Sequence, residues 1–473
     1  MTQSSTVTPV LAPSRQAGST WTLVLAGMGA FMSALDIVVV STALPTMQRH
    51  LGASLADLEW TINAYSLVFG TLMLTGAALG DRFGRRRIYV TGLLIFVAGS
   101  VLAALSTTAG VLIAARVVQG GGAALLQPLT LTLISQAFPP EKRGAAIGIW
   151  GGITGLGVAT GPIVGGVIVQ ALSWQWIFWL NVPVGLLVAA LSATRLTESR
   201  GTRPQLDIGG MVLAMVAFFA LTWAPVRAPS VGWSSAEVTG SLAAGVVFLA
   251  GFLAWERRAR YPMLPLRYFR RRGFASANAV VFFQFSSVIG SLFFITQLFQ
   301  NGMGYSPVGA GLRILVWMAT PMVIAPIAGI AADRFGNKPF MLGGMVLQAA
   351  GLGWLAAITT TGTSYGSLIA PLIVSGIGIS MGFPTVANLV TTSVDPDDIG
   401  VAAGTNNALN ALGGAFGVAI LAAVFAAHGG YESPAAFIHG FRPAEWVATG
   451  AAVIAAVAAV FAPARHPATQ TPA

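Results

Sequence analysis

The chain has 473 residues, of which 55% are hydrophobic and only 8% are charged. A soluble domain is about 25% charged, so this composition excludes a water-soluble enzyme. The 25 basic residues outnumber the 15 acidic ones, but they lie in short loops between apolar segments and form no single basic face, so a nucleic-acid partner is not expected. Cysteine is absent, which excludes disulfides and thiolate metal sites.

Fourteen apolar segments follow one another along the chain, and about 20 residues suffice to cross a bilayer as a helix. Because lipid offers no hydrogen-bond partners, every segment is predicted to be helical, which gives an all-α integral membrane protein. Most arginines and lysines fall in alternate loops, so the positive-inside rule places these loops and both termini in the cytoplasm. We expect a multi-pass protein of the plasma (inner) membrane, and the preference for arginine, alanine and glycine suggests a bacterial source.

The first span follows a polar tail of twenty residues and carries Asp36, the only acidic residue that we place well inside a span. The last span is predicted over 444–462, so Glu445 falls at its end. Asp36 lies roughly 13 Å from the outer end of its span at helical rise. Arg116 lies roughly 9 Å inside the fourth span, which enters from the outside. The two side chains can therefore lie at a similar depth in the bilayer.

Asp36 and Arg116 are the predicted proton-coupling residues. Ionisable residues in spans are energetically costly, and they usually face a cavity or a partner. Burial disfavours the ionised form of a carboxyl group, whereas a nearby guanidinium favours it. A carboxyl group under both influences can take up and release a proton as its access alternates between the two sides of the membrane. The alternative is a permanent ion pair that braces the two spans without titrating.

A short charged sequence occurs twice, as Asp81–Arg86 after the second span and as Asp333–Lys338 after the tenth. The separation corresponds to between eight and nine spans, which fits two six-helix halves with two extra helices between them. Duplicated halves are common in secondary transporters. The predicted organisation is an N-terminal tail (1–20), an N-terminal half (21–195), two inserted helices (196–256), a C-terminal half (257–462) and a C-terminal tail (463–473).

The fifth span is rich in glycine, with residues 148, 152, 157, 161 and 165 at near four-residue spacing. This spacing allows close approach of another helix, and Pro162 removes one backbone hydrogen bond and can bend the span. We expect a closely packed, bendable helix at the interface of the two halves. The alternative is that the glycines serve packing alone.

Several of these segments resemble the motifs of one transporter family. Trp60, Asn63 and Tyr65 follow that family's usual start of the second span, and Ala77 occupies a position that usually holds glycine. From Trp21 to about Phe461, the chain is similar to the fourteen-span drug:proton antiporter family of the major facilitator superfamily. The matching segments are Leu35–Pro45, Leu79–Arg86, Arg116–Ala123, Gly157–Gly166 and Trp174–Pro183.

The resemblance implies roles for the motif residues. The repeated loop would act as a latch in one access state, with a weaker or one-sided second copy because Asn337 replaces the residue that corresponds to Arg85. The alternative is that the loop only sets the topology. The fifth-span motif is associated with antiporters. The gating residues are Asp81, Arg82, Gly84, Arg85, Arg86, Asp333, Arg334 and Gly336, and the antiporter motif comprises Gly157, Gly161, Pro162 and Gly165.

Further polar and aromatic side chains within the spans are candidates for a substrate cavity. Uncharged amides that face lipid are unfavourable, and aromatic side chains adapt to varied ligands. Any single aromatic residue is more often explained by ordinary packing or lipid contact. The candidates are Gln119, Gln127, Trp176, Asn278, Gln284, Trp317, Asn388, Asn406 and Asn410.

The predicted function is export of lipophilic small molecules, such as drugs, antibiotics or secondary metabolites, in exchange for protons by alternating access. The proton gradient would supply the energy, with no cofactor, no metal and no catalytic residue. Partners would be the substrate, protons and membrane lipids, the last of which the basic segment 256–273 can contact; monomers are typical of the superfamily. Alternatives are a proton-coupled importer or, from other classes, a membrane-embedded enzyme or a sensor on a transporter fold.

Overall fold

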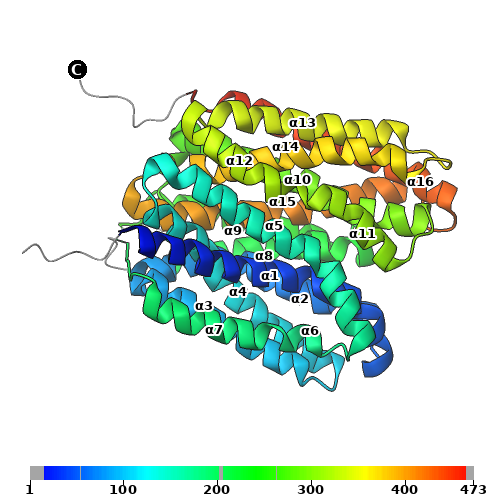
Figure 1. The fold of residues 1–473 in the computed structure, drawn as a ribbon, viewed down its shortest axis with the longest axis horizontal. Helices are drawn as coiled ribbons and strands as arrows, with labels where there is room; N and C mark the ends of the chain where they lie inside the picture. The colour runs from blue at the N-terminus through cyan, green and yellow to red at the C-terminus, as the bar shows by residue number, and fades with distance from the viewer. Residues whose placement is uncertain (1–14, 54, 202–205, 261, 263, 465–473) are drawn as a thin grey trace, which may run out of the picture.

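The structure is a computed structural model that describes residues 15–53, 55–201, 206–260, 262 and 264–464, so most of both predicted tails lies outside it. Every regular element in these ranges is a helix, and fourteen spans are long and apolar enough to cross a membrane, as predicted. Figure 1 shows that α1 begins and α16 ends at the same end of the bundle, which we call the termini side. The opposite end is called the far side.

The spans of the first half are α1 (Arg15–Leu51), α2 (Leu55–Phe83), α3 (Arg85–Ala104), α4 (Ala109–Ala137), α5 (Pro140–Ala171) and the pair α6 (Trp176–Trp179) and α7 (Asn181–Arg195). The inserted helices are α8 (Ile208–Val231) and α9 (Ala236–Glu256). The second half contains η1 (Leu266–Arg270), α10 (Arg272–Gln297), η2 (Leu298–Gly302), α11 (Pro307–Met318), α12 (Thr320–Phe335), α13 (Asn337–Ile358), α14 (Tyr365–Thr392), η3 (Pro396–Asp398), α15 (Ile399–His428) and α16 (Pro434–Val460).

The last span begins earlier than its predicted start at residue 444. The Ser433 hydroxyl accepts a hydrogen bond from the backbone N–H of Ala436, and Pro434 occupies the first turn. Serine as the N-cap and proline at the first helical position are a standard helix start. Polar residues in this first part, among them His439 and Arg442, give it the composition of a loop. Glu445 therefore lies well inside the span.

The two halves repeat the same helix packing. A Cβ atom on Gly92 of α3 would lie 2.9 Å from the carbonyl oxygen of Gly122 on α4. In the second half, a Cβ atom on Gly344 of α13 would lie 2.7 Å from the carbonyl oxygen of Gly378 on α14. Only glycine permits such close backbone approach. The third and fourth spans of each half thus contact each other through corresponding glycines.

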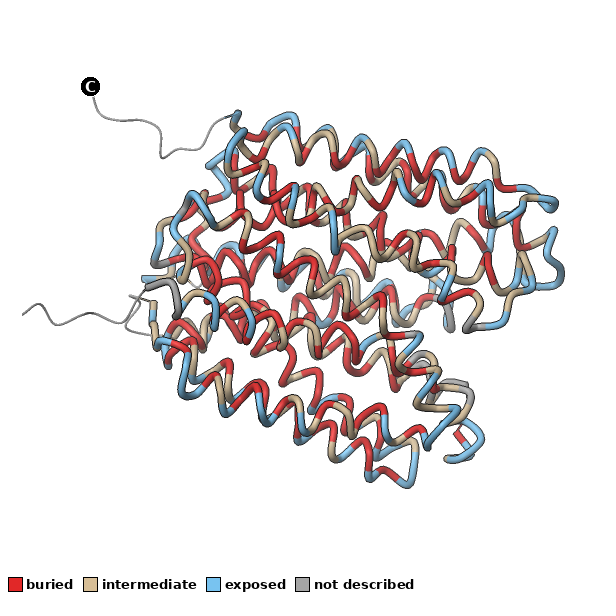
Figure 2. The backbone as a smooth tube through the Cα atoms, viewed as in Figure 1, coloured by how far each residue is buried: buried red, intermediate tan, exposed pale blue. Residues whose placement is uncertain are grey.

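The halves meet along two seams, which pair α5 with α12 and α2 with α15. The inserted helix α8 packs against both α2 and α15, so it lies over the second seam, and α9 packs on α8. Figure 2 shows that exposed residues gather at the ends and on the outer surfaces of the bundle. Large apolar residues such as Val247, Leu187 and Ile327 are more than half exposed there. An apolar outer surface of this kind suits lipid.

Candidate functional site

The predicted pair of Asp36 on α1 and Arg116 on α4 forms in the structure. The Nη1 atom of Arg116 donates to Oδ2 of Asp36 at 2.5 Å, and the exposed fractions of the two side chains are 1% and 0%. An ion pair that is removed from water is favourable only when further hydrogen bonds satisfy its remaining donors and acceptors. The surroundings of this pair supply them.

Amide side chains from two helices complete the bonding of Asp36. Its Oδ1 atom accepts a hydrogen bond from the Nε2 atom of Gln119 and another from the Nδ2 atom of Asn181, both at 2.9 Å. Gln119 also donates to the hydroxyl of Ser100 at 2.7 Å. Since Asn181 opens α7 and Ser100 lies on α3, the cluster ties the first span to the third, fourth and sixth. Gln119, a predicted cavity residue, is therefore fully buried in this cluster.

Arg116 is held by α2 as well. Its Nε atom donates to the carbonyl oxygen of Thr61 at 3.1 Å, and its Nη1 atom also donates to Oε1 of Gln119 at 2.7 Å. The guanidinium carbon lies 4.3 Å from the centre of the Tyr65 ring, which is a favourable cation–π distance. The planar guanidinium thus meets a carboxylate, an amide, a carbonyl and an aromatic ring at once.

The glycines that follow Arg116 bring α4 against its neighbours. A Cβ atom on Gly120 would lie 2.6 Å from the carbonyl oxygen of Tyr65, and one on Gly122 would lie 2.4 Å from the backbone nitrogen of Phe96. Gly121, between them, has room for a side chain, because the nearest atom to its Cβ would be 3.9 Å away, at ordinary van der Waals distance. The motif therefore sets the close contact of α4 with α2 and α3 that the polar cluster requires.

The glycines of α5 contact two different helices. A Cβ atom on Gly148 would lie 2.5 Å from the carbonyl oxygen of Ala325 on α12 in the other half. The antiporter-motif glycines contact α1 instead: Cβ atoms on Gly157 and Gly161 would lie 2.7 Å from Phe31 and Val38, respectively. Gly165 approaches Thr42 and Val39 of α1, and the side chain of Pro162 lies outside the described part.

The expected interface helix, α5, therefore has two regions that contact different helices. Its part near the termini side contacts the other half, whereas the antiporter motif lies against α1 within its own half. The predicted position of this helix between the two halves is confirmed, because α5 packs against α12. Since α1 also carries Asp36, the motif packs directly against the helix that bears the ion pair.

The two copies of the charged loop lie on the termini side. Gly84 and Gly336 are the N-cap residues just before α3 and α13, with φ angles of 112° and 90°, a region that favours glycine. In the first copy the buried Arg85 forms an ion pair of 2.7 Å with Asp81. A Cβ atom on Gly400, in the first turn of α15, would lie 2.5 Å from Oδ1 of Asp81. The first copy thus abuts a helix of the other half.

The second copy also reaches across the seam. The carboxylate of Asp333 accepts hydrogen bonds from the backbone N–H groups of Gly144 and Ala145 in the first turns of α5, both at 2.9 Å. Backbone N–H groups at a helix N-terminus are favourable partners for a carboxylate. Asn337 is bonded to Asn388 within its own half.

The remaining gating arginines do not reach the other half in the contacts that the structure describes. Arg82 and Arg334 are exposed, and Arg86 donates to the carbonyl oxygen of Leu196.

The remaining cavity candidates are dispersed. Gln127 is half-buried and accepts a hydrogen bond from the hydroxyl of Ser33, whereas Trp176 is half-exposed at the far side. Trp317 is fully buried and donates to Ser375. Asn410 is half-buried, and the buried amides are Asn278, Gln284, Asn388 and Asn406.

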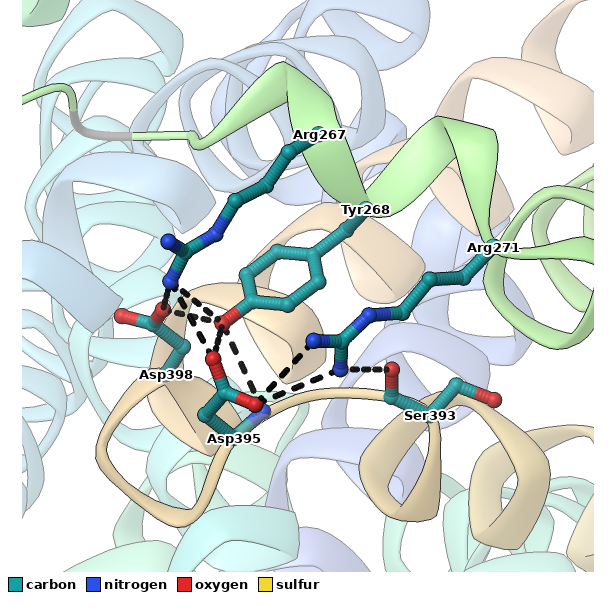
Figure 3. A network of polar contacts seen from close by, with 6 residues as sticks. All are labelled: Arg267, Tyr268, Arg271, Ser393, Asp395 and Asp398. Atoms are coloured by element: carbon teal, nitrogen blue, oxygen red, sulfur yellow. Dashed lines mark hydrogen bonds and ion pairs between the residues drawn. The ribbon is translucent and has the colours of Figure 1, made fainter. Parts of the chain in front are cut away.

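A charged network that the sequence did not reveal joins η1 to the loop between α14 and α15 (Figure 3). The hydroxyl of Tyr268 on η1 contacts the carboxylates of Asp395 and Asp398, and Arg267 and Arg271 form ion pairs with Asp395. Burial, together with the hydrogen bond to Asp398, raises the pKa of Tyr268 to about 12, so this hydroxyl stays protonated as a donor. The hydrogen bond from Tyr268 in turn lowers the pKa of Asp395.

A second residue that the sequence analysis missed is Glu445. Its side chain is 0% exposed, and its Oε1 atom accepts a hydrogen bond of 2.7 Å from the hydroxyl of Ser291 on α10. The expectation that Asp36 is the only acidic residue deep inside a span was therefore wrong. The cause is the misplaced start of the last span.

Solved structures with this fold extend over nearly the whole chain. The human organic anion transporter MFSD10 covers 95% of this chain and 100% of its own, with a TM-score of 0.66 and 14% identity. The proton:xylose symporter XylE covers 94% of this chain and 95% of its own, with a TM-score of 0.67 and 17% identity. At these identities the likeness shows the fold alone.

The sequence comparisons identify the family. The tetracenomycin C resistance and export protein of Streptomyces glaucescens is 36% identical over 420 residues, which are 88% of this chain and 78% of that protein. The puromycin resistance protein pur8 of Streptomyces alboniger is 34% identical over 457 residues, which are 93% of this chain and 90% of that protein. The Major Facilitator Superfamily sequence model matches residues 26–320 and 274–473. This chain is therefore a multi-pass membrane transport protein that belongs to the Major Facilitator Superfamily.

Proposed function

We propose that the protein exports lipophilic small molecules from a bacterial cytoplasm across the plasma membrane in exchange for protons. The observation that carries the proposal is the ion pair of Asp36 and Arg116, which is buried inside the first half. A proton on Asp36 would neutralise the carboxylate and weaken its bond to Arg116. Proton binding would thus release the contact that ties α1 to α4, and proton loss would restore it.

The latch supports alternating access. By the positive-inside rule the termini side faces the cytoplasm. On this side Asp333 bonds to the start of α5 across the seam, and Asp81 abuts the start of α15. These contacts support the assignment of the structure to the conformation that is closed toward the cytoplasm. In this conformation Asp36 is paired, so we assign the paired state of Asp36 to the conformation from which substrate leaves.

The substrate class rests on the relatives, whose names specify resistance to or export of antibiotics, among them tetracenomycin C, puromycin and methylenomycin A. We propose lipophilic small molecules of comparable kind as substrates of this chain. The proton gradient supplies the energy without a cofactor, and one chain contains both the ion pair and the latch, so a monomer suffices.

The test is uptake by inverted membrane vesicles, in which export appears as accumulation. Puromycin, tetracenomycin C and methylenomycin A are offered separately while respiration acidifies the vesicle interior. We expect accumulation of at least one compound that is lost when an uncoupler collapses the proton gradient. Accumulation that persists without the gradient would contradict proton coupling, and proton-driven movement out of these vesicles would indicate an importer.

A further inference from the structure

The second half contains a buried carboxyl group that the proposed mechanism does not use. Glu445 of α16 is 0% exposed, and its Oε1 atom accepts the hydroxyl hydrogen of Ser291 at 2.7 Å. Its Oε2 atom is buried and has no hydrogen-bond partner in the part of the chain that the structure describes. Phe441, Ala444 and Ala448, its neighbours on the helix, belong to the apolar cluster that fills the far side of this half.

The position of Glu445 corresponds to that of the Asp36 cluster in the first half. A Cβ atom on Gly99 would lie 2.7 Å from the backbone nitrogen of Gln119, and one on Gly351 would lie 2.4 Å from the backbone nitrogen of Ser375. These equivalent contacts show that α14 has the place in the second half that α4 has in the first. Glu445 lies on the last span of its half, at nearly the distance from the termini side that Asn181 has on the last span of the first half.

The second cluster lacks the cation of the first. Arg116 precedes Gln119 by three residues, and the residue that precedes Ser375 by three is the buried Leu372. Among the described residues no basic side chain is ion-paired with Glu445, and the nearby Arg442 is exposed and donates to the carbonyl oxygen of Ala356. The other titratable groups on α16 and on the helices packed against it are His439, which is exposed, and Arg272, Lys338 and His428, which lie near helix ends.

A buried carboxylate without a cation is strongly unfavourable, and such a group takes up a proton instead. The Asp36 site is different because Arg116 balances the charge of the carboxylate there. The Asp36 carboxyl group therefore has a counter-charge in its cluster, whereas Glu445 has none among the described residues.

A line of polar groups leads away from Glu445 along α10. Gln284, Ser287 and Ser291 are buried and share one side of this helix, as their spacing of three and four residues requires. Gln348 of α13 lies beside them and donates to the carbonyl oxygen of Gln284 at 3.5 Å. The hydroxyl of Ser287 and the Oε1 atoms of Gln284 and Gln348 have no hydrogen-bond partner among the described protein residues. Water molecules along this line would satisfy these atoms.

We infer that Glu445 is a second proton-binding site of the transporter. It holds a proton in the conformation that is closed toward the cytoplasm and releases this proton, through the polar line along α10, in the opposite conformation. The released proton goes to water, and the carboxyl group becomes a carboxylate. This inference rests on the proposed proton exchange and adds one proton, bound in the second half, to the proton carried by Asp36.

The experiment measures the number of protons exchanged per substrate in proteoliposomes. The ratio is obtained from the membrane potential and pH gradient at which net substrate movement stops. Glu445→Gln keeps the shape of the side chain and an acceptor for Ser291 but cannot release a proton. We expect the ratio to fall by one proton per substrate, while substrate binding is retained. The matched control is Glu432→Gln, which neutralises an exposed glutamate in the far-side loop before the same helix.

An unchanged ratio in Glu445→Gln would overturn the inference while leaving the proposed function intact. A wild-type protein that exchanges no protons at all would instead overturn the proposed function. Infrared spectroscopy provides a readout that does not depend on transport. The carbonyl stretch of a protonated carboxylic acid should be present in the wild type at neutral pH and absent from Glu445→Gln.

A second variant keeps the inference testable if Glu445→Gln does not fold. Ser291→Ala retains the carboxyl group but removes the one hydrogen-bond donor that it has among the described residues, so the infrared band should persist and shift in frequency. A wild-type spectrum without this band, or a band that Glu445→Gln leaves unchanged, would show that Glu445 is not the protonated group.

Discussion

Asp36 and Arg116 bond at 2.5 Å inside the first half, and each is also bonded to Gln119. The three side chains form a closed triangle, so no member can change its charge or orientation without affecting the other two. Removing one partner of a buried ion pair leaves an uncompensated charge, which typically costs about 3–5 kcal/mol. A proton that binds to Asp36 would have the same effect on Arg116.

Asp36→Asn should abolish proton-coupled transport without unfolding the protein. Asparagine has nearly the same shape and still accepts hydrogen bonds, but it cannot bind or release a proton. The measurements are substrate accumulation against a gradient and the thermal stability of the purified protein. An asparagine variant that still concentrates substrate would remove Asp36 from the coupling mechanism.

Arg116→Ala should be at least as damaging, because it leaves a buried carboxylate without its cation and empties the space under the Tyr65 ring. Arg116→Lys should restore part of the activity, since lysine supplies the charge but not the forked geometry that reaches Thr61 and Gln119 together. Transport rates of the two variants in parallel vesicles provide the comparison. Wild-type activity in the alanine variant would show that Arg116 is dispensable.

Gly120→Ala should lower the thermal stability and the transport rate, because the added methyl group would lie 2.6 Å from the carbonyl oxygen of Tyr65. The contact is with backbone, so α2 and α4 must move apart to accommodate it. Gly121→Ala is the matched control, since its Cβ atom has its nearest neighbour at 3.9 Å. Equal stability of the two variants in a melting experiment would contradict the assigned packing role.

Asp333→Asn should shift the protein toward the conformation open to the cytoplasm, because a neutral amide interacts more weakly with the start of α5. The chain has no cysteine, so spin labels can be attached at introduced Thr194→Cys and Phe461→Cys, two exposed positions on the termini side of opposite halves. We expect the population of long label distances to increase. The control Asp207→Asn alters a carboxylate that caps its own helix, α8, and it should leave the distances unchanged.

Monocationic or neutral compounds should be exported better than rigid dications. A dication in a low-dielectric cavity needs about two compensating charges, whereas both oxygens of Asp36 are already bonded and Glu445 is assigned as neutral. The measurement is a resistance panel of mono- and dicationic quaternary ammonium compounds that are matched for size. Equal protection against both would show that another acidic group, or aromatic faces, stabilise the second charge.

The sequence predicts most of the fold because long apolar segments and the distribution of arginines are explicit in it. It also predicts the Asp36–Arg116 pair, since two charged residues at similar depth have few other partners. Asn181 and Ser100 were not assigned to the site, because a single polar residue in an apolar segment does not specify its partner. For the glycines of α5, the spacing predicts a close contact but not which helix makes it.

Glu445 shows a different limit. Pro434, His439 and Arg442 give the start of α16 the composition of a loop, and only the hydrogen-bonded cap at Ser433 shows that the helix begins there. Because the helix begins at Pro434 and not at residue 444, Glu445 is a buried residue in its interior and not a residue at its end. The network around Tyr268 was missed for a related reason, since it joins η1 to the loop between α14 and α15, which are far apart in the sequence.

The most direct test of proton exchange through Asp36 is simultaneous recording of substrate movement and internal pH in proteoliposomes. The wild-type protein is compared with Asp36→Asn and with Glu432→Gln as a control. Addition of substrate should drive proton movement in the opposite direction in the wild type and in the control, and it should drive none in Asp36→Asn. Substrate-driven proton movement in Asp36→Asn at the wild-type rate would contradict the account.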